Sequence, residues 1–293
     1  MVVTRARDRQ QISADLVALT KPRVVLMVLV TTLVGYYIGL DHAPDWARML
    51  HLAVGTALAA GGTLALNQYW ERDVDARMTL TRSRPLPQGR LEALEALIFG
   101  VAISVIGVGH LAVSVNVLAA LVTGAIVVVY VFVYTPLKGQ TALCTLVGAL
   151  PGALPPVIGW VAARDALGAG AWVLFAIMFV WQLPHALAIA WLYREDYARG
   201  GIRVLPVIDS DGTRTERHIA VSSLALFVVS LLATPAGIAG PVYFVTAFVL
   251  GAGFVAIGAQ QALAPSRVAI RRVLFATLVY LPLILTVLAV DKR

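Results

Sequence analysis

A succession of apolar stretches, each about as long as a membrane-spanning helix, constrains the fold more than any other feature. A helix crosses the hydrocarbon core of a bilayer with about 20 consecutive apolar residues, and nine such stretches alternate with short polar joints along the chain. Charged residues make up only 13% of the 293 residues, whereas about a quarter of a soluble domain is charged. The sequence therefore predicts an all-α membrane protein. The predicted spans are residues 24–42, 50–69, 94–111, 115–136, 141–161, 170–192, 219–236, 241–261 and 273–290.

Residues 1–15 precede the first apolar stretch and are predicted to be an N-terminal cytoplasmic tail. They carry three arginines, but the apolar stretch that follows begins late and is long enough to span, so it does not read as a cleavable signal. Residues 16–293 are predicted to form a single membrane-embedded domain.

The positive charges predict which side of the membrane each joint faces. With nine spans, the N-terminal tail and the joints on its side carry 19 of the 23 Lys and Arg residues. Cytoplasmic loops are enriched in these residues, so the N-terminus is predicted in the cytoplasm and the C-terminus in the periplasm. Cationic loops beside an anionic leaflet also account for the net charge of +7, so the expected partner is the lipid bilayer and no nucleic acid. The tail lacks the character of a mitochondrial presequence, which favours a bacterial inner membrane.

A polar face ends the second predicted span. Asn67, Glu71 and Asp75 are spaced four apart, so on a helix they drift by about 40° per step and lie along one face. Mg²⁺ takes oxygen ligands, and one or two carboxylates commonly hold it while substrate phosphates and water complete its shell. The spacing fits such a site. The alternative is a solvated helix end with polar pairs such as Asp73 with Arg77.

Cationic residues accompany this polar face in the sequence. The joint after it contains Arg82 and Arg84 in a proline-stiffened string, and guanidinium groups suit bidentate contacts with phosphate oxygens. Lys21 and Arg23, at the start of the first span, would lie on the same side of the membrane. The alternative is that all these charges only set the topology.

The fifth and sixth predicted spans contain residues that are unusual in a membrane. The string Gly148-Ala-Leu-Pro-Gly-Ala-Leu-Pro-Pro156 must break backbone bonds, so it is predicted to be a kinked helix that lines a pocket; packing through small residues is the alternative. His185 is an ionisable group within a span and is a functional candidate for that reason, with a packing role as the alternative. Glu195 and Asp196 could add a second acidic cluster facing the first.

Together these residues resemble the UbiA superfamily of intramembrane prenyltransferases. The Asn67, Glu71 and Asp75 spacing, followed by an Arg-Pro-Leu-Pro-x-Gly loop, resembles the first acidic motif of that superfamily. Further strings resemble the members that farnesylate haem, and the match runs over residues 16–208. These strings begin at Leu19, Tyr134, Gly148, Trp181 and Tyr193. The resemblance implies a bundle of nine transmembrane helices with a central cavity and cytoplasmic cap loops.

The resemblance also implies an activity and a site. Farnesyl diphosphate would donate its farnesyl group to a vinyl group of haem b, with addition of water, to give haem O and diphosphate. Mg²⁺ would be the cofactor, held by Asn67, Glu71 and Asp75. The other catalytic residues would be Arg82, Arg84, Lys138, Arg194 and Asp196. The substrate-binding residues would be Lys21, Arg23, Tyr134, Trp181, His185 and Tyr193. A downstream haem A synthase or the assembly of a terminal oxidase would use the product.

Two positions depart from the superfamily pattern. Glu71 stands where many members have Asp, which keeps the carboxylate and resembles the haem-farnesylating members. Leu192 stands four residues before Asp196, where the superfamily has a second Asp. The pattern therefore does not support a second magnesium site, and Asp196 would act alone or orient Arg194.

Two other functions stay open at this point. Transfer of a prenyl chain to an aromatic acceptor such as 4-hydroxybenzoate would use the same diphosphate machinery, although the Trp-Gln-Leu-Pro-His string argues against it. A non-catalytic haem-binding or transport protein would use His185, but it leaves the polar face beside an arginine loop unexplained.

Overall fold

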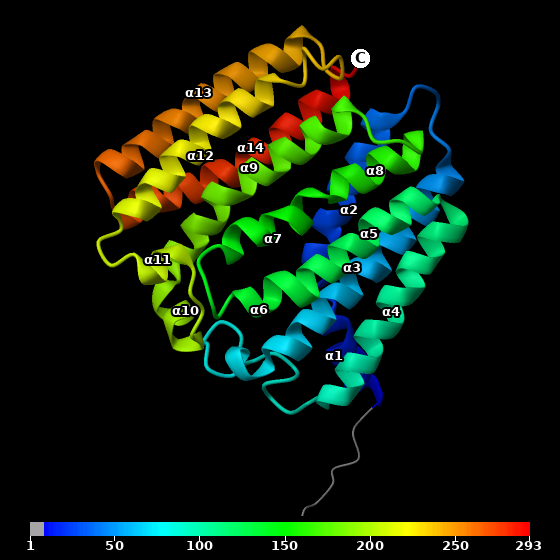
Figure 1. The fold of residues 1–293 in the computed structure, drawn as a ribbon, viewed down its shortest axis with the longest axis vertical. Helices are drawn as coiled ribbons and strands as arrows, with labels where there is room; N and C mark the ends of the chain where they lie inside the picture. The colour runs from blue at the N-terminus through cyan, green and yellow to red at the C-terminus, as the bar shows by residue number, and fades with distance from the viewer. Residues whose placement is uncertain (1–8) are drawn as a thin grey trace, which may run out of the picture.

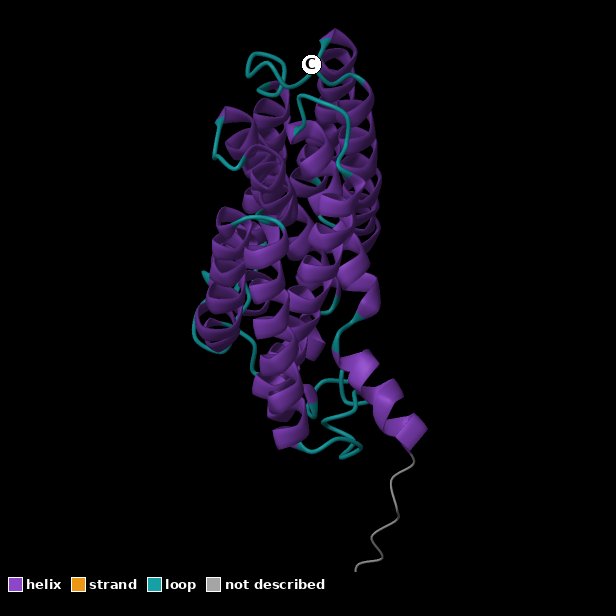
Figure 2. Cartoon of the chain, turned by 90° about the vertical axis from the view of Figure 1, so that its right-hand side faces the viewer, coloured by secondary structure: helices purple, strands orange, loops and turns teal. Residues whose placement is uncertain are grey.

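A computed structural model describes residues 9–293, in which the regular structure is helical apart from one isolated bridge between Ala239 and Lys292. Figures 1 and 2, drawn at right angles, show the long helices lying side by side in one bundle. In chain order the elements are α1 (Arg9–Leu19), α2 (Pro22–Gly39), α3 (Trp46–Asp75), α4 (Ala93–Ser114), α5 (Val117–Val128), the π-helix η1 (Val129–Tyr134), α6 (Thr135–Leu137), α7 (Cys144–Ala153), α8 (Pro155–Arg164), α9 (Ala169–Leu192), α10 (Arg194–Gly200), α11 (Leu205–Ile208), α12 (Thr213–Leu231), α13 (Pro241–Leu263) and α14 (Arg267–Val290).

Eight helical segments within residues 9–293 are long and apolar enough to cross a membrane. They are α2, α3, α4, α5 continued through η1 and α6, α7 with α8, α9, α13 and α14. These segments correspond to eight of the nine predicted spans. The remaining span, predicted at 219–236, is α12, which begins earlier than predicted. Its first turns include Arg214, Glu216 and Arg217, and these charges leave it without an uncharged apolar stretch as long as those of the other eight.

Helix α1 leads into the first span. The predicted tail lies partly outside the described residues, and from Arg9 the chain is helical. Leu19 is buried and packs with residues of α3 and α4, and Asp15 is also buried. Lys21 then adopts a left-handed backbone conformation with φ of 48°, which is uncommon for a residue with a side chain. This sharp turn separates α1 from α2, which starts at Pro22.

The proline-rich fifth span is a broken helix, as predicted. It divides at Leu154 into α7 and α8, and Pro151, Gly152 and Pro155 line a cavity. Small residues also pack closely here: a Cβ on Gly159 would lie 1.8 Å from the carbonyl oxygen of Thr32. Both interpretations of the string therefore hold, because α7 lines the cavity while α8 packs directly against α2.

Candidate active site

The last turns of α3 form a buried acidic face made of Asn67, Glu71 and Asp75. As the spacing predicted, the three side chains lie along the same side of the helix. The side chain of Asp73 is 86% exposed, which agrees with its position on the opposite side. The acidic face is buried because residues far away in the sequence cover it.

Each carboxylate of the acidic face pairs with a cation from another element. The Nζ atom of Lys138 lies 2.7 Å from Oε1 of Glu71. An NH1 group of Arg84 donates to Oδ2 of Asp75, also at 2.7 Å. Buried charges are costly without such partners, so the end of α3, the loop that follows it and the joint after α6 are held together by charge.

The π-helix η1 precedes the residues that cover the acidic face. Such wide turns are rare in proteins and often occur at functional sites. The hydroxyl of Thr135 donates to the carbonyl of Tyr130 at 2.8 Å and accepts from the Asn67 amide at 3.2 Å. The ammonium group of Lys138 lies 4.5 Å from the ring centroid of Tyr134, a distance typical of a cation–π contact. This local geometry directs Lys138 toward α3.

Lys21 adds a third cation close to the acidic face. Burial lowers its pKa to about 7, and repulsion from Arg84 and Lys138 adds to the effect, while attraction from Glu71 and Asp75 opposes it. The left-handed turn before α2 places Lys21 here. This position agrees with the expectation that the start of the first span faces the same site.

Asp196 holds the loop that carries the arginines and does not join the acidic face. Its carboxylate accepts from the backbone N–H of Thr79 at 2.8 Å and from that of Leu80 at 3.0 Å, and it pairs with Arg199. Burial alone would raise the pKa of Asp196, but these donors hold it below its usual range. Glu195 is exposed. The second acidic cluster that the sequence left open is therefore absent from the described residues, which contain no group of three or more His, Cys, Asp or Glu arranged to hold a metal.

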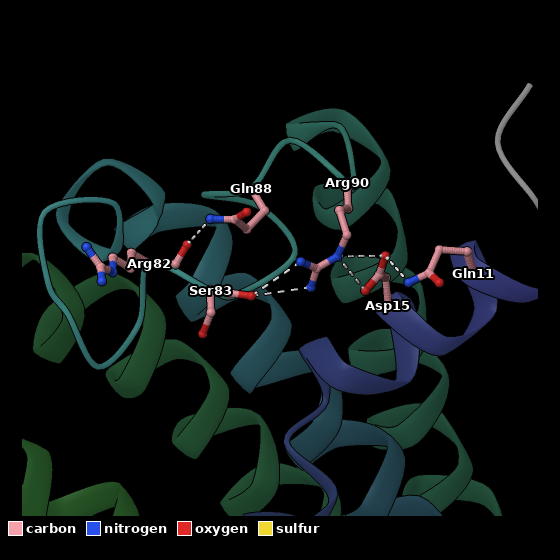
Figure 3. Close-up of polar contacts among 6 residues, drawn as sticks. All are labelled: Gln11, Asp15, Arg82, Ser83, Gln88 and Arg90. Atoms are coloured by element: carbon pink, nitrogen blue, oxygen red, sulfur yellow. Dashed lines mark hydrogen bonds and ion pairs between the residues drawn. The ribbon is translucent and has the colours of Figure 1, made fainter. Parts of the chain in front are cut away.

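The same loop is anchored on its other side to α1. Figure 3 shows the guanidinium of Arg90 against the carboxylate of Asp15, with an Nε to Oδ1 distance of 3.0 Å. Arg90 also donates to the carbonyl of Ser83 at 3.4 Å, and Gln88 donates to that of Arg82 at 2.7 Å. The loop is thus fixed at both ends, which holds Arg84 over the acidic face while the Arg82 side chain is exposed.

An apolar cavity of about 820 Å³ begins beside the acidic face. Its walls come from α2, α3, α5, η1, α7, α8, α9 and α14, and Arg23, Tyr130 and Thr63 line it. Thr63 is one helical turn before Asn67. The cavity also reaches Met27 on α2 and Val290 on α14, which are 58% and 83% exposed. It therefore opens sideways between α2 and α14, and its volume suits a small organic ligand.

His185 is anchored in the wall of this cavity. Its ring stacks on Trp181 with centroids 4.9 Å apart, and its Nδ1 lies 2.9 Å from the hydroxyl oxygen of Thr277 on α14. That hydroxyl also lies 2.6 Å from the carbonyl oxygen of Leu274, and when it donates there, it accepts from His185 Nδ1–H. In that arrangement the neutral ring has its proton on Nδ1 and a lone pair on Nε2.

Two further predicted site residues, Arg194 and Tyr193, also lie away from the acidic face. The guanidinium of Arg194 sits 5.1 Å from the ring centroid of Trp191, and Tyr193 is exposed. Sequence analysis missed three residues that do lie at the site, namely Thr135, Tyr130 and Tyr197. Burial raises the pKa of Tyr197, and Lys138 and Glu71 are among the charges that act on it. Thr135 and Tyr197 each stand inside a string already singled out by resemblance, and that was the available signal.

Known proteins resemble this chain along most of its length. The pattern of the UbiA prenyltransferase family matches residues 28–280. A protoheme IX farnesyltransferase from Solibacter usitatus (strain Ellin6076) is 46% identical over 287 residues, which cover 95% of this chain and 98% of the relative.

Solved structures share the architecture at low sequence identity. One of digeranylgeranylglyceryl phosphate synthase superposes with a TM-score of 0.82 at 15% identity, covering 96% of this chain and 98% of that one. A UbiA homolog from Archaeoglobus fulgidus, bound to GPP and Mg²⁺, gives a TM-score of 0.65 at 16% identity, with 94% and 99% covered. At these identities the two structures show a common fold.

Proposed function

Since the chain belongs to the UbiA prenyltransferase family, we propose that it transfers the farnesyl group of farnesyl diphosphate to a vinyl group of haem b. Water adds in the same reaction, and haem O and diphosphate are released. The observation that carries the proposal is a pair of buried carboxylates, Glu71 and Asp75, each matched with a cation beside an apolar cavity. The protoheme IX farnesyltransferase that is similar along nearly its whole length supports the choice of acceptor.

The acidic face fits a magnesium ion that arrives with a diphosphate. Asn67, Glu71 and Asp75 offer one amide oxygen and two carboxylates, and Mg²⁺ needs few protein ligands when phosphates and water supply the others. Bound there, Mg²⁺ would neutralise charge on the departing diphosphate. The magnesium and GPP in the homolog from Archaeoglobus fulgidus support this assignment.

The cations of the site, Lys21, Arg84 and Lys138, have different roles without and with substrate in this proposal. Without substrate, Lys138 and Arg84 neutralise the buried carboxylates. With substrate, they and Lys21 turn toward phosphate oxygens. As the C–O bond of farnesyl diphosphate breaks, its electron pair leaves with the diphosphate, and these cations stabilise the growing negative charge.

The cavity walls protect the other product of that bond cleavage. The allylic farnesyl cation is shielded from water by the apolar side chains. The terminal carbon of the haem vinyl group attacks C1 of the farnesyl cation, a C–C bond forms, and the positive charge moves to the inner vinyl carbon. Water then adds to that carbon and loses a proton. Arg23 and Trp181, which line the cavity, would bind substrate there, and Tyr134 would do so beside Lys138. Nε2 of His185 would contact the haem, because neutral imidazole suits iron.

We propose that the protein lies in the inner membrane of a bacterium and that this site faces the cytoplasmic side. Helix α12 serves as the ninth span, since it packs against α9 and α13 although its first turns are charged. The loop after α3 and the segment around α10 then form the cytoplasmic cap, and the C-terminus is periplasmic, because the positive residues gather at the end of the bundle that carries the acidic face. A haem A synthase or a terminal oxidase under assembly would receive the product.

A metal-dependence experiment tests the site. Purified protein in detergent is given haem b and farnesyl diphosphate with Mg²⁺ or with EDTA, and diphosphate release is measured. We expect Mg²⁺-dependent release that falls by at least about 100-fold in Glu71→Gln. The matched control is Asp73→Asn, which changes an exposed carboxylate two residues away and should leave the rate unchanged. Equal loss in both variants, or full activity of Glu71→Gln, would contradict the assignment of the acidic face.

A further inference from the structure

A second cavity lies between α13 and α14, with a volume of about 640 Å³. It shares no lining residue with the cavity beside the acidic face. Its wall is apolar along most of its length, and Arg271 and Arg272, near the start of α14, line it as well. We propose that this groove binds an anionic phospholipid, with an acyl chain along the apolar wall and the phosphate at the two arginines.

The apolar part of the groove faces outward from the bundle. Val249, Val268 and Phe275 line it and are among the most exposed apolar side chains, with Phe275 at 68%. Gly253 also lines it, and a Cβ built on this residue would meet no atom within 4 Å. The missing side chain leaves a depression between the two helices. In a membrane protein, such a depression is filled by lipid chains or by another protein.

The charge of the groove selects between these occupants. Arg271 and Arg272 are exposed, and no salt bridge within residues 9–293 involves either of them. The contact of Arg272 is with the amide oxygen of Gln260, at 3.4 Å. Basic pockets between membrane helices attract anionic lipid head groups. A guanidinium group can also donate two hydrogen bonds to the oxygens of one phosphate.

A second copy of the chain fits this face less well. A two-fold contact brings the same patch of both copies together, so it would set two pairs of guanidinium groups against one another. A phospholipid supplies both an apolar chain and the missing negative charge. α13 ends and α14 begins at the same end of the molecule as α10 and α11 (Figure 1), so the lipid would belong to the leaflet on the side of the acidic face.

Lipid retention measured by native mass spectrometry tests the proposal. Protein in detergent is mixed with equal amounts of phosphatidylglycerol and phosphatidylcholine. We expect wild type to retain phosphatidylglycerol preferentially. The preference should fall by about fivefold for Arg271→Gln or Arg272→Gln and by about 25-fold for the double variant, because each cation near a membrane surface contributes a similar factor. The control Arg267→Gln removes an arginine of the same helix that does not line the groove and should keep the wild-type preference.

A second variant tests the contribution of the apolar groove independently of the two arginines. Gly253→Leu has room at its own position and should fill the groove, so retention of both lipids should drop while the protein stays folded. Equal retention of the two lipids by wild type, or an unchanged preference in the double variant, would overturn the proposal. So would competition by inorganic phosphate alone, which would indicate a site for free anions, or a dimer that Gly253→Leu dissociates, which would identify a second copy as the occupant.

Discussion

At the scale of single residues, the acidic face depends on charge pairs that bury both partners. Lys138 and Glu71 are both largely buried, and a buried charge that loses its partner is costly. The pair therefore links stability to the same atoms that would handle the diphosphate. Stability and activity can be separated experimentally because removing both charges is less damaging than removing one.

We predict that Lys138→Met destabilises the protein by about 3 kcal/mol, since it leaves the Glu71 carboxylate buried without its cation. The double variant Lys138→Met with Glu71→Met should recover most of that loss while staying inactive. Thermal unfolding in detergent, analysed as a double-mutant cycle, measures both effects. Additive losses in the double variant would show that the two groups do not interact.

The Asp196 carboxylate stabilises the loop after α3 by accepting hydrogen bonds from its backbone. Asp196→Ala should free the N–H groups of Thr79 and Leu80, destabilise the loop by about 1 to 3 kcal/mol and raise the KM for farnesyl diphosphate. The control is Glu195→Gln, which changes an exposed neighbour in the same short helix. A fall in kcat with unchanged KM would instead assign Asp196 a direct part in the chemistry.

The lowered pKa of Asp196 also predicts a pH dependence. A carboxyl group whose folded-state pKa is depressed stabilises the fold above its unfolded pKa of about 4 and loses that effect as the pH falls through the folded value. Limited proteolysis of the loop after α3 should therefore find it protected at pH 5 to 8 and released only below about pH 4. Release at pH 6 would contradict this account of how the loop is held.

At the scale of elements, glycine positions decide how closely helices pack. A Cβ on Gly35 would lie 2.0 Å from the carbonyl oxygen of Pro156, and backbone atoms cannot move aside cheaply. Gly35→Ala should therefore greatly reduce the yield of folded protein. Gly109→Ala on α4 has open space around it and should be neutral or stabilising by about 0.5 to 1 kcal/mol. Equal yields of the two variants, measured by size-exclusion chromatography in detergent, would refute the close contact between α2 and α8.

The elements also differ in how well the sequence predicts them. Long apolar stretches identify eight spans because the bilayer imposes their length. The start of α12 was predicted too late, since its first turns are charged although they continue the helix. The π-helix η1 could not be predicted, because its wide turns depend on contacts such as that of Thr135 with α3.

Within the site, residue spacing predicted which side chains share a helix face, but not which cation pairs with each carboxylate. A period of four predicts that Asn67, Glu71 and Asp75 share a face, because helix geometry is local. The sequence also marks Arg84 and Lys138 as nearby cations, but which carboxylate each one meets depends on folded loops. Asp196 was expected to act alone or to orient Arg194, but it binds the backbone N–H groups of Thr79 and Leu80. Backbone groups carry no signal in a sequence, so this contact could not be predicted.

At the scale of the whole molecule, the bundle joins a charged end to an apolar interior that opens sideways. The acidic face and its cations lie at one end, the cavity runs from there past His185, and its opening lies between α2 and α14. A substrate with a charged head and a long apolar tail fits this arrangement, since each part meets a matching environment. The fold therefore suits transfer of a prenyl group more closely than it suits simple haem carriage.

The most direct test of this account offers the wild-type protein a choice of acceptor. Protein in lipid nanodiscs is given farnesyl diphosphate and Mg²⁺ together with haem b and 4-hydroxybenzoate, and the products are identified by mass. We predict haem O with release of diphosphate and no prenylated benzoate. Haem b that binds but stays unmodified, or prenylated benzoate beside unchanged haem, would contradict the central claim.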